Sequence, residues 1–217
     1  MNSADADREA FAAFLLRMRA KGISSKEVVA AFEATPRANF ISQRWQSVAW
    51  SDRMVPIECG EAMEGVDTQA LVVNALHIEP GNRVLEIGTG SGYTAAVLSR
   101  LAGKVTSVDR YKTLVDLARD RLDALGISNV QLRHADGSDG LVSEGPFDRI
   151  IVWPAFDAMP RGFADQLASG GIMIAVIGEA EEPQLMTRLT KVGSRFDRFD
   201  LGLVRFQPML QGVAAAL

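Results

Sequence analysis

Cysteine and histidine are scarce in this sequence, and long apolar runs are missing. Cys59 is the only cysteine and there are two histidines among 217 residues. One cysteine cannot form an internal disulfide, and no His, Cys or Asp cluster has the spacing of a metal site. No window approaches the ~18–20 consecutive apolar residues of a membrane span, and the first residues lack the features of a signal peptide. We therefore expect a cytoplasmic protein without metal or membrane segment.

Positive charge is also in short supply. Lys and Arg number 23 against 27 Asp and Glu, which gives a formal net charge of -4. Nucleic-acid-binding proteins normally present a basic face, so the charge balance disfavours a nucleic-acid partner. A hydrophobic content of 47% over 217 residues is enough for one large domain or a domain with a modest extension.

Strands and helices are expected to alternate from about residue 68 onward. Apolar runs such as RIIVW and IMIAVI are typical of strands buried on both faces, as parallel strands are. The fold class predicted is α/β, a doubly wound, mostly parallel sheet (residues 67–217) with an N-terminal helical cap (1–66) that includes an irregular stretch at 36–66. The predicted strands cover 83–87, 104–109, 129–136, 148–153, 171–178 and a late pair within 184–207; the predicted helices lie within 5–34 and at 68–78, 92–102, 111–125 and 161–168.

Three alternate glycines stand directly between a predicted strand and a predicted helix. The segment RVLEIGTGSGYTAAVL contains Gly88, Gly90 and Gly92. Such a turn lets backbone N–H groups and a helix N-terminus face a ligand. The spacing is G-x-G-x-G, and Tyr93 occupies the place of the third glycine of a dinucleotide motif. A nucleotide-like ligand is expected, with a dinucleotide as the alternative.

Acidic residues follow or precede this turn at informative positions. Asp109 ends the next strand, about 20 residues on, where a carboxylate can accept hydrogen bonds from ribose hydroxyls. Asp136 and Gly137 end the third strand, near the expected adenine position. Glu86 lies inside the first strand, and an ammonium or sulfonium on the ligand would balance its buried charge. The alternatives are that Asp109 caps a helix and Asp136 a loop.

At this point the sequence resembles a known family. VLEIGTGSGYTAAVL, VTSVDR, HADGSDG and PFDRIIV resemble the S-adenosylmethionine-binding motifs of class I methyltransferases. ATPRANFI, AWSDRMVPIECG, LASGGIMIAVIG and VRFQPML resemble, more narrowly, segments of the protein-L-isoaspartate O-methyltransferase family. The resemblance implies an S-adenosylmethionine-dependent O-methyltransferase whose cofactor is held by Glu86, Gly88, Thr89, Gly90, Ser91, Gly92, Asp109, Arg110, Asp136 and Gly137.

The segment expected at the reacting centre departs from the family. The family signature G-Q-T-I-S-Q-P corresponds to GEAMEGV, residues 60–66, so Glu64 stands at the catalytic Ser and Ala62 at the Thr. A second substrate-contacting stretch, T-A-A in the family, corresponds to Trp153-Pro154-Ala155. The candidate catalytic residues are the acids Glu61, Glu64 and Asp67.

These acids allow more than one function. Two like charges 4 Å apart repel by roughly 4 kcal/mol at an effective dielectric constant of ~20, which disfavours a carboxylate acceptor. The same acids could serve as a general base toward a hydroxyl, phenol or amine, or could be solvated loop residues. The family resemblance nevertheless implies methylation of isoaspartyl residues in proteins or peptides, and this is the function we expect. The alternatives are a methyltransferase for a small-molecule acceptor and a cofactor-binding homologue without isoaspartyl activity.

Overall fold

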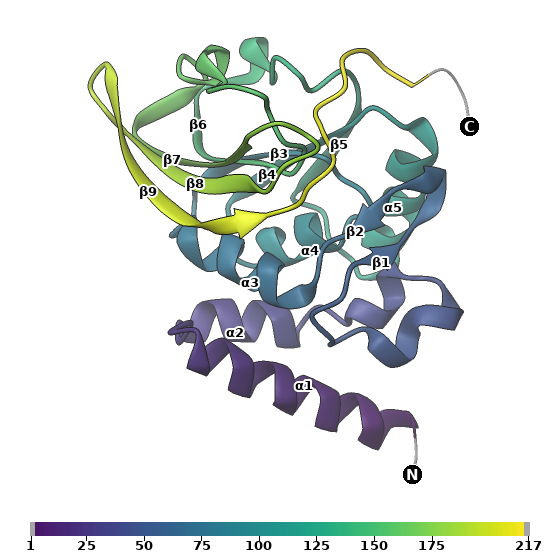
Figure 1. The fold of residues 1–217 in the computed structure, drawn as a ribbon. Coiled ribbons are helices and arrows are strands. Elements are labelled where there is room, and N and C mark those ends of the chain that lie inside the picture. Colours follow the sequence, from purple (N-terminus) through teal and green to yellow (C-terminus); the bar gives the residue numbers. More distant parts are fainter. Residues whose placement is uncertain (1–2, 215–217) are drawn as a thin grey trace.

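A computed structural model of the chain describes residues 3–214 and contains a seven-stranded sheet (Figure 1). The strand order is β5-β4-β3-β6-β7-β8-β9. The five strands from β5 to β7 are parallel, and β8 runs antiparallel to both of its neighbours. The predicted mostly parallel α/β sheet is thereby confirmed. The strands are β3 Arg83–Ile87, β4 Lys104–Asp109, β5 Val130–His134, β6 Phe147–Val152, β7 Leu167–Ile177, β8 Gln184–Val192 and β9 Arg195–Val204.

The helices gather on one face of the sheet, below it in Figure 1. Next to the sheet lie α3 (Val66–Ala75), α4 (Tyr93–Ser99) and α5 (Lys112–Ala124). Outside them lie α1 (Ser3–Ala20) and α2 (Lys26–Glu33). The Ser25 hydroxyl accepts a hydrogen bond from the Val28 N–H and so caps the N-terminus of α2.

The opposite face is covered by turns, and here one prediction is wrong. The segment 161–168 contains only a 3₁₀ turn, Arg161–Phe163, and β7 begins at Leu167. Pro160 and Gly162 disfavour a longer helix here. In addition, the Gln166 side chain accepts a hydrogen bond from the Leu141 N–H, which ties this segment to the neighbouring loop. A second 3₁₀ turn, Val142–Glu144, precedes β6. The second apolar cluster, which includes Leu85, Ile150, Phe163 and Met173, is thus covered largely by loop.

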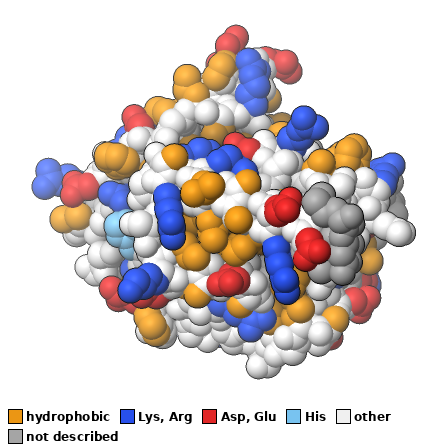
Figure 2. All heavy atoms as spheres, turned by 90° about the horizontal axis from the view of Figure 1, so that it is seen from below, with side chains coloured by type: hydrophobic (Ala, Val, Ile, Leu, Met, Phe, Trp, Pro, Cys, Tyr) orange, Lys and Arg blue, Asp and Glu red, His pale blue; other side chains and the backbone are white. Residues whose placement is uncertain are grey.

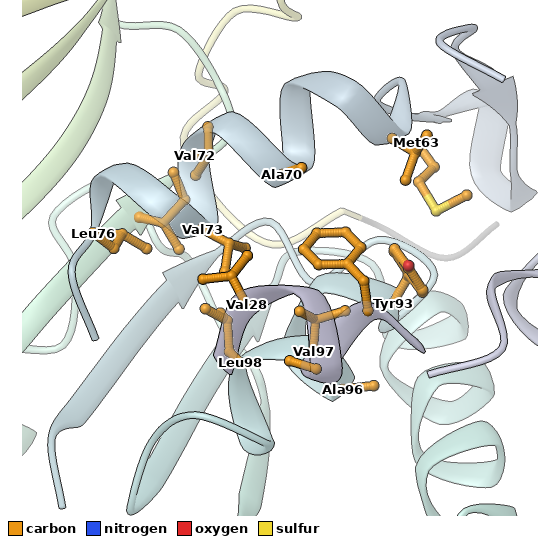
Figure 3. Close-up of a cluster of buried hydrophobic side chains, with 14 of the residues drawn as sticks. Val28, Met63, Ala70, Val72, Val73, Leu76, Tyr93, Ala96, Val97 and Leu98 are labelled. Carbon is orange, nitrogen blue, oxygen red and sulfur yellow. The ribbon is translucent and has the colours of Figure 1, made fainter. Parts of the chain in front are cut away.

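Buried side chains on the helical face join the N-terminal segment to the sheet. The larger cluster extends from Phe14 to Phe206. Figure 3 shows side chains of this cluster from three helices, among them Val28 of α2, Val73 of α3 and Val97 of α4. Burying such side chains contributes roughly 1.5–3 kcal/mol each. The helical cap is therefore packed on the same core as α3 and α4.

The stretch between α2 and α3 is irregular, as expected, and it reaches the strand ends. It holds three 3₁₀ turns (Arg37–Phe40, Gln43–Val48, Glu58–Gly60) and the paired two-residue strands β1 (Val55–Pro56) and β2 (Ala62–Met63). Cys59 has a positive φ of 62° in the turn between β1 and β2. This hairpin brings residues 57–64 over the carboxyl ends of the parallel strands.

The surface carries mixed charge. On the face seen in Figure 2, Lys and Arg side chains are interspersed with Asp and Glu and with apolar atoms. Within residues 3–214, no helix has the length and hydropathy needed to cross a bilayer. Across the same described residues, no group of three His, Cys, Asp or Glu side chains could hold a metal ion.

Candidate active site

A cavity of about 230 Å³ opens at the carboxyl ends of β3, β4 and β6. In open parallel sheets this edge, where the strand order reverses beside the first strand, is the usual ligand site. The walls come from the 57–64 hairpin, the glycine turn, the end of β4, the loop after β6 and residues 207–210. The predicted site residues in its lining are Glu61, Glu64, Gly88, Thr89, Gly90, Ser91, Asp109, Arg110 and Gly137.

Two of the three glycines of the turn line the cavity. Gly88 and Gly90 have φ values of 96° and 52°, which residues with a side chain rarely adopt. The Gly90 N–H donates to the Asp109 carboxylate at 2.8 Å. A Cβ at Gly88 would lie 3.2 Å from the Trp153 Cβ. These glycines keep the wall of the cavity flat and free of side chains.

Gly92 has a different role from the one the sequence suggests. It does not line the cavity. A Cβ on Gly92 would lie 2.8 Å from the Cβ of Ala118 on α5, so this position is needed for close packing of the turn against a helix. Its neighbours Thr89 and Ser91 do line the cavity, with the Thr89 hydroxyl bonded to Ser107 at 2.7 Å.

Asp109 lies where the sequence predicts, at the end of β4, and it is 7% exposed. Its carboxylate accepts hydrogen bonds from the N–H groups of Gly90 and Tyr111 at 2.8 and 2.9 Å. Burial raises the pKa of Asp109, and the nearby charge of Glu61 adds to this, against those hydrogen bonds. The carboxylate oxygens keep acceptor capacity toward the cavity, as a ribose site requires.

Arg110 and Asp136 hold the end of the chain in place. The Arg110 guanidinium donates to the Gly212 carbonyl at 3.1 Å, and Asp136 accepts the Gly212 N–H at 2.6 Å. Asp136 is exposed and outside the cavity lining, unlike its neighbour Gly137. A Cβ on Gly137 would lie 2.7 Å from Ile87 Cγ2. The predicted adenine position therefore has Gly137 in the wall and Asp136 as an anchor for the C-terminal segment, defined here as residues 207–214.

Glu86 is fully buried and does not reach the cavity. Its carboxylate accepts hydrogen bonds from the Ser107 hydroxyl at 2.6 Å and the Trp153 indole N–H at 3.1 Å. Burial raises the pKa of Glu86 to about 7, although these two bonds act in the opposite direction. From the sequence, Glu86 is expected to hold the cofactor through a positive charge on the ligand. The structure corrects this, because its partners are the protein groups Ser107 and Trp153 and it lies behind the cavity wall.

The three candidate catalytic acids are not brought together. Asp67 is 2% exposed and pairs with Arg17 at 2.9 Å and Lys21 at 2.8 Å, outside the cavity lining. Burial acts to raise the pKa of Asp67, but the hydrogen bonds from these cations hold it below its usual value. The structure therefore gives Asp67 a place in the attachment of α1 to α3, which corrects its expected place beside the acceptor.

Glu61 and Glu64 both line the cavity but at different ends. Glu61 is close enough to Asp109 and Tyr111 to raise the pKa of both, after the larger effect of burial. Glu64 lies toward Gln69 and Arg37, and among the described residues its carboxyl has no hydrogen-bond or ion-pair partner within 4 Å. Burial raises the pKa of Glu64 to about 7. We call the end of the cavity lined by Glu64 and Gln69 the acceptor end, because the sequence predicts the methyl acceptor beside Glu64. Of the three acids, only Glu64 lies at this end.

Several lining residues were missed by the sequence interpretation. Gln69 of α3 and Thr94 of α4 lie beside Glu64 in the cavity lining, and the Gln69 Nε2 group donates to Thr94 Oγ1 at 3.0 Å. Their signal was weak, because an isolated Gln or Thr on a helix is ordinarily a surface residue. Residues 207–210 complete the wall through the bonds of Ala155 with Gln207 and Met209. The segment VRFQPML gave a resemblance but no indication of this contact.

Two solved structures that superpose on most of this chain carry the names of methyltransferases. A protein-L-isoaspartate O-methyltransferase superposes with a TM-score of 0.82 at 26% identity, over 95% of this chain and 67% of its own. A β-aspartate methyltransferase from Plasmodium falciparum, solved with S-adenosyl-L-homocysteine, gives a TM-score of 0.77 at 23% identity, over 91% and 97% of the two chains. The fold and the cavity define a methyltransferase with a Rossmann-like sheet.

Sequence comparison narrows this class to a family. Residues 9–214 match the family Protein-L-isoaspartate(D-aspartate) O-methyltransferase (PCMT). The chain is 44% identical over 202 residues to a protein-L-isoaspartate O-methyltransferase of Rhizobium meliloti, covering 93% of this chain and 99% of that one. It is 42% identical over 217 residues, and 100% of both chains, to the enzyme of that name from Azorhizobium caulinodans. The chain belongs to the protein-L-isoaspartate(D-aspartate) O-methyltransferase family, and the predicted family is confirmed.

Proposed function

We propose that this chain transfers the methyl group of S-adenosylmethionine to the free carboxylate of L-isoaspartyl residues in proteins or peptides. The observation that carries the proposal is the match to relatives of that name over the whole chain, at 42% identity across 217 residues. The cavity supports it, because the glycine turn and Asp109 lie at one end and Glu64 with Trp153 line the remainder.

The residues present fit the cofactor. The side-chain-free wall at Gly88 and Gly90 suits the methionine part, Asp109 suits the ribose hydroxyls, and Gly137 leaves room beside the adenine. When bound, S-adenosylmethionine supplies an electrophilic methyl group on its sulfonium. The protein has to place the acceptor in line with that methyl group and exclude water; an ionised carboxylate needs no base.

Glu64 is the residue that has to be reconciled with a carboxylate acceptor. With Asp67 paired to Arg17 and Lys21, and Glu61 near Asp109, Glu64 is the one acid left to meet the acceptor. With a pKa of about 7, its carboxyl is protonated in a large share of molecules near neutral pH. A protonated carboxyl can donate a hydrogen bond to the acceptor, as the hydroxyl of the family's Ser would. The ionised form would repel it by roughly 4 kcal/mol.

The pH dependence of methylation tests this role. We expect kcat/KM of the wild type for an isoaspartyl peptide to fall by up to about tenfold per pH unit above pH 7, as Glu64 loses its proton. The Glu64→Ser variant should show a flat profile over the same range. The matched control is the same peptide with a normal aspartyl residue, which should accept no methyl group. A flat wild-type profile would contradict the donor role of Glu64.

A second function is favoured by the same side chain. A partly buried carboxyl with a pKa of about 7 and no protein partner among the described residues is also suited to be a general base. The acceptor would then be a hydroxyl or amine of a small molecule. In that case the rate would rise, rather than fall, as the pH passes 7, and no isoaspartyl peptide would be methylated by the wild type or by Glu64→Ser.

The organisation and location of the enzyme are part of the same proposal. We propose that residues 1–66 cap the methyltransferase unit of residues 67–217 and supply one wall of the acceptor site. The lining residues Ile57 and Glu61 to Glu64 support this division. A cytoplasmic location is proposed because the single cysteine suits a reducing compartment.

A further inference from the structure

A buried arginine lies behind the acceptor end of the cavity. Arg37 is 0% exposed, and no carboxylate oxygen of the described residues lies within 4 Å of its guanidinium in an ion pair. Nη2 donates to the main-chain carbonyl of Glu64 at 2.6 Å, and Nη1 donates to the Gln69 amide oxygen. Its charged plane lies 4.9 Å from the Tyr93 ring centre. Burying such a group is costly unless the charge is used.

The chemistry of arginine fixes the direction of the hydrogen bonds that follow. Arginine has five N–H donors and no acceptor, so the Gln69 amide oxygen must face Arg37. The Gln69 Nε2 group therefore faces Thr94, 3.0 Å away, and Thr94 Oγ1 must accept. The hydroxyl hydrogen of Thr94 is left to be donated elsewhere. Thr94 is the second residue of α4, and within residues 3–214 no other hydrogen bond of its hydroxyl is found.

The free hydroxyl hydrogen lies at the cavity. Thr94 is 5% exposed and Gln69 3% exposed, and both line the cavity beside Glu64. Water reaches such a buried donor poorly, so an unmatched O–H here is unfavourable unless a bound molecule accepts it. The charge of Arg37 at the far end of the chain of bonds favours an anionic acceptor. Burial lowers the pKa of Arg37 to about 10, which still leaves it charged at neutral pH.

We propose that Arg37, Gln69 and Thr94 form a relay that binds a carboxylate in the cavity through the Thr94 hydroxyl. Gln69 and Arg37 are positioning residues, and Thr94 is the group that touches the ligand. Two carboxylates have this chemistry: the acceptor's own, and the one on the methionine part of S-adenosylmethionine. The relay provides polar groups at a site where the Thr, Ser and second Gln of the family signature are replaced in this chain by Ala62, Glu64 and Gly65. This inference rests on the proposed function only for its acceptor arm.

Binding measurements with two nucleosides test the cofactor arm without turnover. S-adenosylhomocysteine carries the carboxylate, whereas 5′-methylthioadenosine lacks it. If the relay binds the cofactor, Thr94→Val should raise the Kd for S-adenosylhomocysteine about tenfold and leave that for methylthioadenosine unchanged, a loss typical of a hydrogen bond to a charged group. Thr94→Ser should restore the wild-type value. Thr106→Val, a buried threonine of β4 outside the cavity lining, is the matched control and should change neither Kd.

Peptide kinetics test the acceptor arm. If the relay binds the acceptor, Thr94→Val should raise KM for an isoaspartyl peptide about tenfold with both nucleoside Kd values unchanged. Gln69→Leu should change the same constant in the same direction by a smaller factor. The proposal is overturned if Thr94→Val changes neither constant, if it weakens both nucleosides equally, or if Thr94→Ser does not restore the affected constant. A selective loss of S-adenosylhomocysteine binding would stand even if no isoaspartyl peptide were methylated.

Discussion

The two ends of the cavity differ in how closely they follow the family pattern. At the nucleotide end, Gly88, Gly90 and Asp109 take the positions that their order in the chain implies, and main-chain bonds such as Gly90 N–H to Asp109 fix them. At the acceptor end, Glu64 replaces the family's Ser, and the polar groups around it come from Gln69 and Thr94. The nucleotide end is built around a backbone turn that one carboxylate fixes, and the acceptor end is built mainly from side chains.

This difference has a physical cause. A turn between a strand and a helix is set by local dihedral angles, so few residues can form it and the sequence shows it directly. Side-chain contacts between two helices can be made by several pairs of residues. A Gln on α3 and a Thr on α4 can therefore provide polar groups that another sequence places in the loop before α3. We therefore expect the acceptor end to tolerate replacement better than the nucleotide end.

The largest effect is expected at the nucleotide end. Asp109→Ala removes the carboxylate that accepts the Gly90 and Tyr111 N–H groups and that faces the ribose position. The variant also loses the hydrogen bonds that the two ribose hydroxyls of the ligand would donate to this carboxylate. Two such bonds to a charged group are worth about 4 kcal/mol together, so the Kd for S-adenosylhomocysteine should rise about a thousandfold. Isothermal titration calorimetry measures this. A loss of less than tenfold would mean that the two ends do not differ in their tolerance.

A second test concerns Glu86, which joins the two ends through Ser107 and Trp153. Its pKa in the folded protein is about 7, above the 4.5 of an ordinary glutamate. Between pH 4.5 and pH 7 the folded protein therefore keeps a proton on Glu86 that the unfolded chain has already released. Stability should therefore fall as the pH rises through this range, by about 3 kcal/mol at most from this group. Urea denaturation at pH 5, 6, 7 and 8 measures the slope.

Glu86→Gln is the matching variant, because without a charge its amide oxygen can still accept from the Trp153 indole N–H while its NH2 group donates to the Ser107 hydroxyl. It should lose the share of the pH dependence that Glu86 contributes and exceed the wild type in stability above pH 7. Glu64, with its own raised pKa, should account for part of the slope that remains. Parallel curves for the variant and the wild type would show that Glu86 keeps an ordinary pKa.

The smallest of the three effects is expected at Asp67, which lies on α3 and pairs with Arg17 of α1 and with Lys21 directly after α1. Asp67→Asn weakens these bonds and should lower the free energy of unfolding by about 2 kcal/mol. The Kd for S-adenosylhomocysteine and the KM for the peptide should stay unchanged. Chemical denaturation and initial-rate kinetics distinguish this from a catalytic role, in which kcat would drop while stability stayed constant.

Much of the fold could be predicted because its signals are local. The strands Arg83–Ile87 and Lys104–Asp109 follow from short apolar runs bounded by turn residues, and both match the predicted limits. The helix expected at 161–168 failed because its few helix-forming residues are outweighed by the bonds of Gln166 to the neighbouring loop. That contact joins residues 25 positions apart, which periodicity does not detect.

The part of the site that has a local signal in the sequence was also predictable. Gly88, Gly90 and Asp109 are marked by the turn itself. The positions of Asp67 and Gly92 depend on which partner a neighbouring helix offers, namely Arg17 for one and Ala118 for the other. The role of Arg37 depends on three segments that meet only in the folded protein. Contacts between segments that are distant in the sequence can be recognised only in the folded structure.

The attachment of residues 207–214 to Arg110 and Asp136 has a consequence for the biosynthesis of the enzyme. The wall that these residues complete is added after every other part of the cavity has been translated. A nascent chain still held on the ribosome at residue 205 would possess the glycine turn and Asp109 but could not enclose a nucleoside. The cavity should thus be able to enclose its cofactor only once residues 207–214 have emerged from the ribosome.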